Sequence, residues 1–299
     1  MYCFCVKQYG VCIILQNYVA KLHIFFIFAK KIFTMQYGFV FLSVVPVRKE
    51  SNSRSEQVTQ LLFGDVVRIV DTYKGTNKIT DSWLKIENVS DNYQGWIDER
   101  NIILFEAETL PQYKYIVSSI FAKISIKNKL NPQIEKTINI VMASKLFDKV
   151  FTLNDWEIKI TEGNVIPILK CSPLLISAVS MLYLSTPYQW GGKSVVGMDC
   201  SGFTQNVFAF AGVSLSRDAS QQALQGRENS YDNIQKNDLV FFDNQEGKIT
   251  HVGIYLGANE VIHCSGRVRI DKLDKEGIYI EKDSNKEYSH HLCLIRSIV

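Results

Sequence analysis

The stretch that most constrains this chain is residues 188–210, which place Cys200 just before an apolar helix. A glycine-rich loop leads into Asp-Cys-Ser-Gly at 199–202, and the apolar run 203–211 then ends at Gly212. Backbone N–H groups without partners and the positive end of the helix dipole favour an anion at such a position. The pattern therefore predicts a lowered thiol pKa and a reactive thiolate.

Two histidines follow in short alternating apolar runs. His251 lies in residues 250–256 and His263 in residues 260–264, and both runs have the period of a strand. If the strands are neighbours, both imidazoles can face Cys200 and supply a base and a group that orients it. One such cysteine or histidine alone is more often structural. The three in this order favour nucleophilic catalysis.

Composition narrows the remaining classes. The 299 residues are 46% hydrophobic and 21% charged, which leaves room for two or three globular domains. A net charge of +3, from 33 basic and 30 acidic residues, gives no reason to expect a nucleic-acid partner. The seven scattered cysteines do not form a disulfide framework and lack zinc-ligand spacing. No metal and no cofactor are predicted.

Residues 1–34 are unlike the rest of the chain. Their apolar run is interrupted by polar residues and is too short for a spanning helix, so stable membrane insertion is not expected. They also lack a charged n-region and a small-residue cleavage site. We predict a non-native extension, with a native start at Met35 and a cytoplasmic protein. The alternative is a weak targeting segment of an exported or envelope-associated protein.

From Met35 the chain consists of short apolar runs separated by polar or glycine-containing turns, which is typical of strands. Five such runs predict a small barrel over residues 35–105. Strand-like runs continue through residues 106–172 and predict a second β domain. Residues 173–299 begin with an apolar helix at 174–184 and end in strands, which is an α+β layout.

The first β region resembles a bacterial SH3 domain. The residues that carry the likeness are V-P-V-R-K-E at 45–50, Q-L-L-F-G-D-V-V-R-I-V at 60–70, S-W-L-K-I at 82–86 and Y-Q-G-W-I-D at 93–98. By extension, residues 106–172 are predicted to be a second, degenerate SH3-like domain.

The last domain resembles the NlpC/p60 family of papain-like cysteine peptidases. Five motifs occur in order: Y-Q-W-G-G at 188–192, D-C-S-G-F at 199–203, R-D-A-S-Q-Q at 217–222, N-D-L-V-F-F at 237–242 and H-V-G-I-Y at 251–255. The resemblance implies Cys200 as nucleophile, His251 as general base and His263 as the residue that orients it. The predicted architecture is multidomain, with all-β SH3-like barrels followed by an α+β papain-like cysteine peptidase domain.

SH3-like domains before this peptidase resemble γ-D-glutamyl-L-diamino acid endopeptidases, which cut murein peptides. The resemblance implies a short murein peptide with a free L-Ala terminus, cleaved between γ-D-glutamate and a diamino acid that is either diaminopimelate or lysine. Its ammonium group would contact Asp199, Tyr93 and Glu56. Tyr188 and the Cys200 backbone N–H would stabilise the oxyanion, with Ser201 in the same site. A peptidoglycan-binding SH3 protein and a related thiol amidase or acyltransferase are the alternatives.

Overall fold

The computed structural model describes residues 36–76, 81–169, 172–283 and 285–299. The predictions for residues 1–34 therefore lie outside the described residues. Residues 37–105 and 111–299 form one compact unit, and Gln36 and residues 106–110 are assigned to another. Within the described ranges, no helix has the length and apolar character needed to span a membrane.

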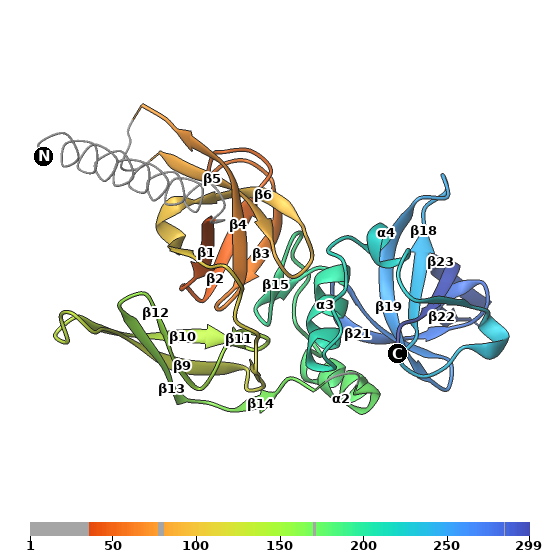
Figure 1. Ribbon diagram of the computed structural model, residues 1–299. Coiled ribbons are helices and arrows are strands. Elements are labelled where there is room, and N and C mark those ends of the chain that lie inside the picture. Colours follow the sequence, from red (N-terminus) through yellow and green to blue (C-terminus); the bar gives the residue numbers. More distant parts are fainter. Residues whose placement is uncertain (1–35, 77–80, 170–171, 284) are drawn as a thin grey trace, which may run out of the picture. The chain divides into compact units, whose positions relative to one another are not determined.

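The first sheet has seven strands in the order β3-β2-β6-β5-β4-β1-β7 (Figure 1). Residues 37–47 contain two strands, because β1 pairs with β4 whereas β2 pairs with β3 and β6. Alternate side chains such as Leu84 and Ile86 point inward and form the core. The elements are β1 (Gln36–Val40), β2 (Val44–Arg48), β3 (Gln57–Leu62), β4 (Val66–Lys74), β5 (Ser82–Asn88), β6 (Gln94–Asp98), the 3₁₀ helix η1 (Glu99–Asn101) and β7 (Ile102–Glu106).

Two smaller sheets follow, in the orders β10-β9-β13-β12 and β11-β8-β14. All the pairings within them are antiparallel, and Ile124, Ile126 and Ile158 are buried between the strands' polar residues. The strands are β8 (Tyr115–Val117), β9 (Phe121–Asn128), β10 (Glu135–Val141), β11 (Lys145–Leu146), β12 (Val150–Leu153), β13 (Trp156–Glu162) and β14 (Val165–Pro167).

The last part of the chain places helices before a sheet of order β17-β23-β18-β19-β20-β21-β22, in which β22 also pairs with β23. The predicted histidine strands are confirmed. The elements are α2 (Pro173–Leu182), β15 (Lys193–Ser194), β16 (Gly197–Met198), α3 (Cys200–Phe210), α4 (Ala219–Gln222), β17 (Arg227–Asn229), η2 (Tyr231–Asn233), β18 (Leu239–Asp243), β19 (Ile249–Gly257), β20 (Glu260–Ser265), β21 (Arg267–Leu273), β22 (Gly277–Lys282) and β23 (Asn285–Ser297).

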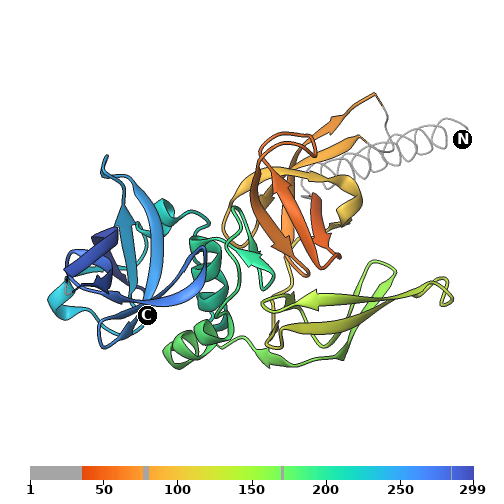
Figure 2. The ribbon, with the colours of Figure 1, turned by 180° about the vertical axis from the view of Figure 1, so that it is seen from behind.

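Helix α3 is the central element of this domain. It lies beside α2 and along β19 (Figures 1 and 2), and almost all of its side chains are buried. Phe203, Val207 and Phe210 are fully covered in a core that includes Val252 and Ile262 from the sheet. Burying each large apolar side chain stabilises the fold by about 1.5–3 kcal/mol. The helix that carries Cys200 is therefore held rigidly against the strand that carries His251.

Candidate active site

Cys200 is the first residue of α3, as the sequence predicts. Asp199 caps the helix in an extended conformation, and its Oδ1 accepts a hydrogen bond of 2.7 Å from the backbone N–H of Gly202. The preceding loop needs glycine at 191, because φ there is +69° and a Cβ would lie 2.6 Å from the carbonyl oxygen of Gln57. The loop before Cys200 is therefore packed directly against the start of β3 in the first sheet.

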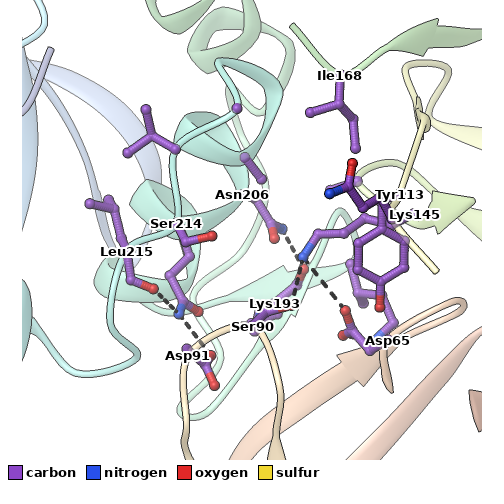
Figure 3. Close-up of a pocket in the computed structure, with 17 residues that line it drawn as sticks. Asp65, Ser90, Asp91, Tyr113, Lys145, Ile168, Lys193, Asn206, Ser214 and Leu215 are labelled. Atoms are coloured by element: carbon purple, nitrogen blue, oxygen red, sulfur yellow. Dashed lines mark hydrogen bonds and ion pairs between the residues drawn. The ribbon is translucent and has the colours of Figure 1, made fainter. Parts of the chain in front are cut away.

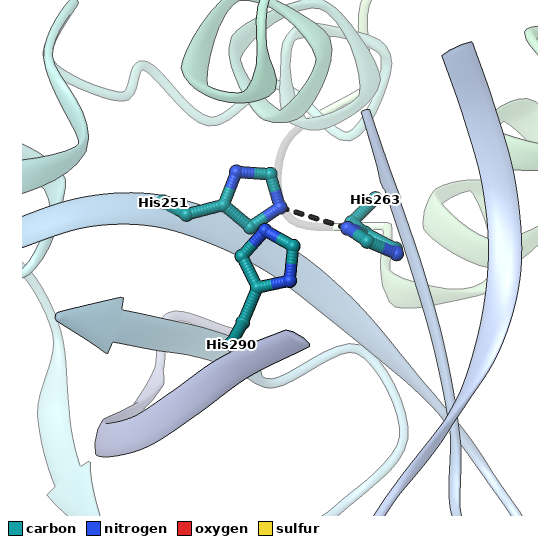
Figure 4. Close-up of side chains that lie close together, drawn as sticks. All are labelled: His251, His263 and His290. Atoms are coloured by element: carbon teal, nitrogen blue, oxygen red, sulfur yellow. Dashed lines mark hydrogen bonds between the residues drawn. The ribbon is translucent and has the colours of Figure 1, made fainter. Parts of the chain in front are cut away.

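His251 and His263 lie on the neighbouring strands β19 and β20, which pair Gly253 opposite His263. Nε2 of His251 is 2.8 Å from Nδ1 of His263, and both rings are buried (Figure 4). Nε2 of His263 is in turn 3.0 Å from Oδ2 of Asp271 on β21. The structure thus brings the predicted base and its predicted partner into direct contact, and it adds a carboxylate that sequence reasoning missed.

The Cys200 thiol lies beside the same strand, because it takes backbone hydrogen bonds from Val252, the neighbour of His251, and from Ser201. Burial, followed by the charge of Asp199, nevertheless raises the pKa of Cys200 to about 12. Burial, followed by the charges of His263, His290 and Arg269, holds the pKa of His251 well below its usual range. Both shifts favour a neutral thiol and a neutral imidazole in the resting enzyme. They oppose the predicted thiolate, because burial acts against the helix dipole.

This protonation state predicts how Cys200 reacts with iodoacetamide. Only the thiolate is alkylated, so a raised pKa should make the rate rise about tenfold per pH unit between pH 7 and 10. Mass spectrometry of the peptide that contains Cys200, sampled over time at each pH, measures that rate. A rate plateau between pH 5 and 7 would instead indicate a preformed thiolate–imidazolium pair and contradict the neutral state.

The Asp199 carboxylate also accepts hydrogen bonds from groups outside the helix that it caps. Arg217 donates from Nη1 to Oδ1 at 3.0 Å and from Nη2 to Oδ2, and the backbone N–H of Gly191 also donates to Oδ2 at 3.0 Å. The Arg217 guanidinium is almost fully buried, and its Nε donates to Oγ1 of Thr59 on β3 at 2.6 Å. A carboxylate offers about four lone pairs. Asp199 would therefore have to exchange a partner before it could hold a substrate ammonium group.

A cavity of about 360 Å³ opens over Cys200. The lining includes Cys200 together with all five predicted oxyanion or substrate-binding residues, namely Tyr188, Asp199, Ser201, Tyr93 and Glu56. Burial raises the pKa of Tyr188 to about 12, so its hydroxyl stays protonated and can donate a hydrogen bond. The cavity thus combines residues of the first sheet with residues of the domain that carries Cys200.

Asp218 is the carboxylate in this cavity that sequence reasoning missed. It lies within the R-D-A-S-Q-Q motif, but the motif does not reveal that it hydrogen-bonds the hydroxyl of Tyr93. Burial raises the pKa of Asp218 and, as the largest cause, raises that of Tyr93 to about 12. Both groups are half-buried and line the cavity. They form a polar pair that an ammonium group can join.

Glu56 contributes to the site through a tryptophan. Its Oε1 accepts a hydrogen bond of 2.9 Å from the indole nitrogen of Trp190, and the side chain of Gln57 donates to the carbonyl oxygen of Trp190 at 3.2 Å. Oε2 of Glu56 lies 3.5 Å from Lys49 in an exposed pair. Glu56 therefore helps hold Trp190 of the Y-Q-W-G-G motif at the cavity wall.

A third imidazole, His290 on β23, completes a cluster in which one nitrogen from each ring lies within 4.8 Å of the others. Three histidines can hold zinc. Here, however, His251 and His263 direct nitrogens at each other at 2.8 Å, and the rings of His251 and His290 face each other with centroids 4.5 Å apart (Figure 4). The 2.8 Å separation is that of a hydrogen bond, so the cluster suits proton transfer better than metal binding.

A larger cavity of about 520 Å³ is lined by the later residues of α3. Figure 3 shows Lys145 beside Asp65 and Ser90, with Nζ at 3.8 Å from Oδ1 of Asp65 and 3.2 Å from Oγ of Ser90. Asn206 donates to the backbone oxygen of Lys193 in the same cavity. Neither the candidate nucleophile nor its histidines line it. The smaller cavity over Cys200 is therefore the candidate active site.

A buried cysteine at a helix start, beside two neighbouring strands that each carry one histidine of a hydrogen-bonded pair, is the arrangement of a thiol peptidase. Residues 185–287 match the NlpC/P60 family, and residues 47–102 match the domain described as "Bacterial dipeptidyl-peptidase Sh3 domain". The chain is a cysteine peptidase that joins an NlpC/P60 domain to a bacterial SH3 domain.

Named relatives match either most of this chain at lower identity or about a third of it at higher identity. "Dipeptidyl-peptidase 6" of Lysinibacillus sphaericus is 26% identical over 76% of this chain and 88% of its own length. "Gamma-D-glutamyl-L-lysine dipeptidyl-peptidase" of Bacillus subtilis is 45% identical, over 38% of this chain and 37% of its own. The crystal structure of an NlpC/P60 family protein from Bacillus cereus superposes with a TM-score of 0.69 at 19% identity, covering 87% of this chain and 99% of that one. This last likeness supports a shared fold.

Proposed function

We propose that the protein hydrolyses the bond between γ-D-glutamate and an L-diamino acid in short murein peptides that begin with a free L-Ala. The observation that carries the proposal is the Asp218–Tyr93 pair in the cavity that also contains Cys200. Such a pair suits a buried ammonium group, which needs a carboxylate partner. The name of the Bacillus subtilis relative supports the same bond.

The reaction follows from the proposed roles. As Sγ of Cys200 attacks the γ-glutamyl carbonyl carbon, its proton passes to His251. The backbone N–H of Cys200 and the hydroxyl of Tyr188 stabilise the oxyanion. His251 then donates the proton to the departing amine of the diamino acid. Water, deprotonated by His251, attacks the thioester and releases L-Ala-γ-D-Glu and the free thiol.

The cavity walls account for the preference for a short peptide. Glu56 and Tyr93 immediately precede β3 and β6 of the first sheet, and both line the same cavity as Cys200. Trp190 is tied to that sheet by the hydrogen bonds to Glu56 and Gln57. These side chains close the side of the site that receives the amino terminus of the peptide. A peptide attached through L-Ala to a glycan chain has no room there, and it has no free ammonium group for the polar pair to bind.

The test offers the enzyme L-Ala-γ-D-Glu-L-Lys and its diaminopimelate counterpart, each also in N-acetylated form, alongside intact peptidoglycan. We expect cleavage of the free-amine peptides, with kcat/KM about 10- to 100-fold lower after acetylation, because an ionic hydrogen bond contributes about 1.5–3 kcal/mol. Mass spectrometry identifies the products. Equal cleavage of both forms, or cleavage of intact wall alone, would overturn the proposed substrate.

The Asp218→Asn variant tests the residue itself. Loss of the carboxylate charge should raise KM for the free-amine peptide about tenfold or more and narrow the gap between free and acetylated peptides. Asp232→Asn, at an exposed position of the same domain, is the matched control and should behave like the wild type. An unchanged preference for the free amine in Asp218→Asn would remove Asp218 from the amine site.

A further inference from the structure

A chain of hydrogen bonds extends beyond the predicted catalytic residues. Nε2 of His251 is 2.8 Å from Nδ1 of His263, and Nε2 of His263 is 3.0 Å from Oδ2 of Asp271. The same oxygen of Asp271 accepts a bond of 2.8 Å from Nε of Arg269. His263 is fully buried and Asp271 is largely covered. The carboxylate is thus placed at the inner end of the histidine pair.

We propose that Asp271 is a positioning residue that sets the tautomers of His263 and His251, so that Nδ1 of His251 is free to accept the thiol proton of Cys200. The proposal rests on the roles given above to Cys200 and His251. It adds a fourth residue to the set that the sequence predicts.

The position of each proton follows from the carboxylate outward. An ionised carboxylate only accepts hydrogen bonds, so the His263 nitrogen that faces Asp271 must carry the proton. The hydrogen bond from His263 is the largest of the causes that lower the pKa of Asp271, which keeps it ionised. A neutral His263 then has a bare Nδ1, which accepts from Nε2–H of His251. The remaining His251 nitrogen, Nδ1, is left without a proton.

The opposite arrangement cannot work as a base. If Nδ1 of His263 carried the proton, it would donate to Nε2 of His251, and a neutral His251 would then carry its own proton on Nδ1. A protonated Nδ1 cannot accept the proton of Cys200. Asp271 disfavours that state, because its oxygen would then face a bare nitrogen without a hydrogen bond. It therefore selects the competent tautomer for both rings.

The charge of Asp271 also acts during the reaction. When His251 takes the thiol proton it becomes an imidazolium, and a carboxylate one ring away stabilises that charge. The other charged or titratable groups around the histidine pair either disfavour the imidazolium or are uncharged. Arg269 on β21 lowers the pKa of His251, and His290 on β23 has a pKa of about 4, lowered mainly by burial, so it is uncharged at neutral pH.

The first test reads the tautomers without any substrate. In ¹⁵N-histidine-labelled protein, long-range ¹H–¹⁵N spectra distinguish Nε2–H from Nδ1–H rings, and single His→Gln variants assign the five histidines. We expect both His251 and His263 as Nε2–H in the wild type. In Asp271→Leu we expect a mixture in which Nδ1–H forms appear. Unchanged Nε2–H rings in that variant would overturn the proposal, whatever the substrate proves to be.

The second test is kinetic, with two variants and one control. Asp271→Leu should lower kcat about 100-fold or more with little change in KM, in line with the size of general-base effects. Asp271→Asn keeps an oxygen for both His263 and Arg269 and loses only the charge, so we expect about a tenfold loss. The matched control is Asp243→Asn, which removes the charge from a separate pair with His291 at 2.9 Å. It should retain wild-type kinetics.

The pH profile of Asp271→Asn separates positioning from folding. His251 must be unprotonated to act as the base, and removal of a negative charge lowers the pKa of its imidazolium, so the acidic limb of kcat/KM should move to lower pH. The amide is nearly isosteric, so this variant answers the question if Asp271→Leu does not fold. An acidic limb at the wild-type position, with wild-type kcat, would contradict the proposal.

Discussion

Replacing Cys200 by alanine should lower kcat/KM by about 10⁴-fold or more, because the nucleophile is lost and only transition-state binding by the rest of the cavity is left. His251→Ala should be nearly as severe, since a neutral thiol with a pKa raised to about 12 cannot attack without a base. The double variant should be no worse than either single one, because the two residues act as one unit. Release of the diamino acid from the tripeptide, followed by mass spectrometry, measures the rates.

A matched control for these variants is Cys293→Ala. This thiol is exposed on β23 and donates a weak hydrogen bond of 3.4 Å to the backbone oxygen of Phe241. Its loss should leave kcat/KM unchanged. More than a few per cent of wild-type activity in Cys200→Ala, with thermal stability retained, would require a different nucleophile.

The sequence predicts the elements of the site better than their protonation. The glycine loop, the helix start at Cys200 and the two histidine strands are local patterns, and each is found where it is predicted. Whether a thiol is charged depends on what covers it. Burial raises its pKa, and the neighbouring Asp199 raises it further. The sequence shows the helix terminus but not the burial or the effect of Asp199 on the thiol. It therefore predicts a thiolate, whereas the structure favours a neutral thiol.

The partners of the carboxylates are likewise set by the tertiary fold. Asp199 and Asp218 both lie in motifs that the sequence shows. Only the packed structure reveals that Asp199 pairs with Arg217 and that Asp218 hydrogen-bonds Tyr93. Asp271 lies in a run, Arg-Val-Arg-Ile-Asp-Lys-Leu, whose alternation is the signal of a strand. That strand, β21, is missing from the sequence prediction. Its pairing with β20 brings Asp271 to His263.

The buried ion pair explains why the first sheet and the Cys200 helix act together. Arg217 joins Thr59 of β3 to Asp199, and Asp199 caps the helix that begins at Cys200. The guanidinium is almost fully buried. An ion pair of this kind adds little net stability compared with apolar residues, but removing one partner leaves a buried charge without compensation. The geometry of the nucleophile therefore depends on a residue that does not react.

Arg217→Met should consequently lower the free energy of unfolding of the peptidase domain by about 3–5 kcal/mol, measured by urea denaturation. Adding Asp199→Asn to that variant should recover part of the loss, because the amide oxygen still caps the helix and no charge is left buried. Arg100→Met breaks an exposed pair with Asp98 and should leave unfolding nearly unchanged. If Arg217→Met and Arg100→Met were equally mild, Arg217 would not be the residue that compensates Asp199. A double variant less stable than Arg217→Met alone would mean that Asp199 contributes through its cap and not through its charge.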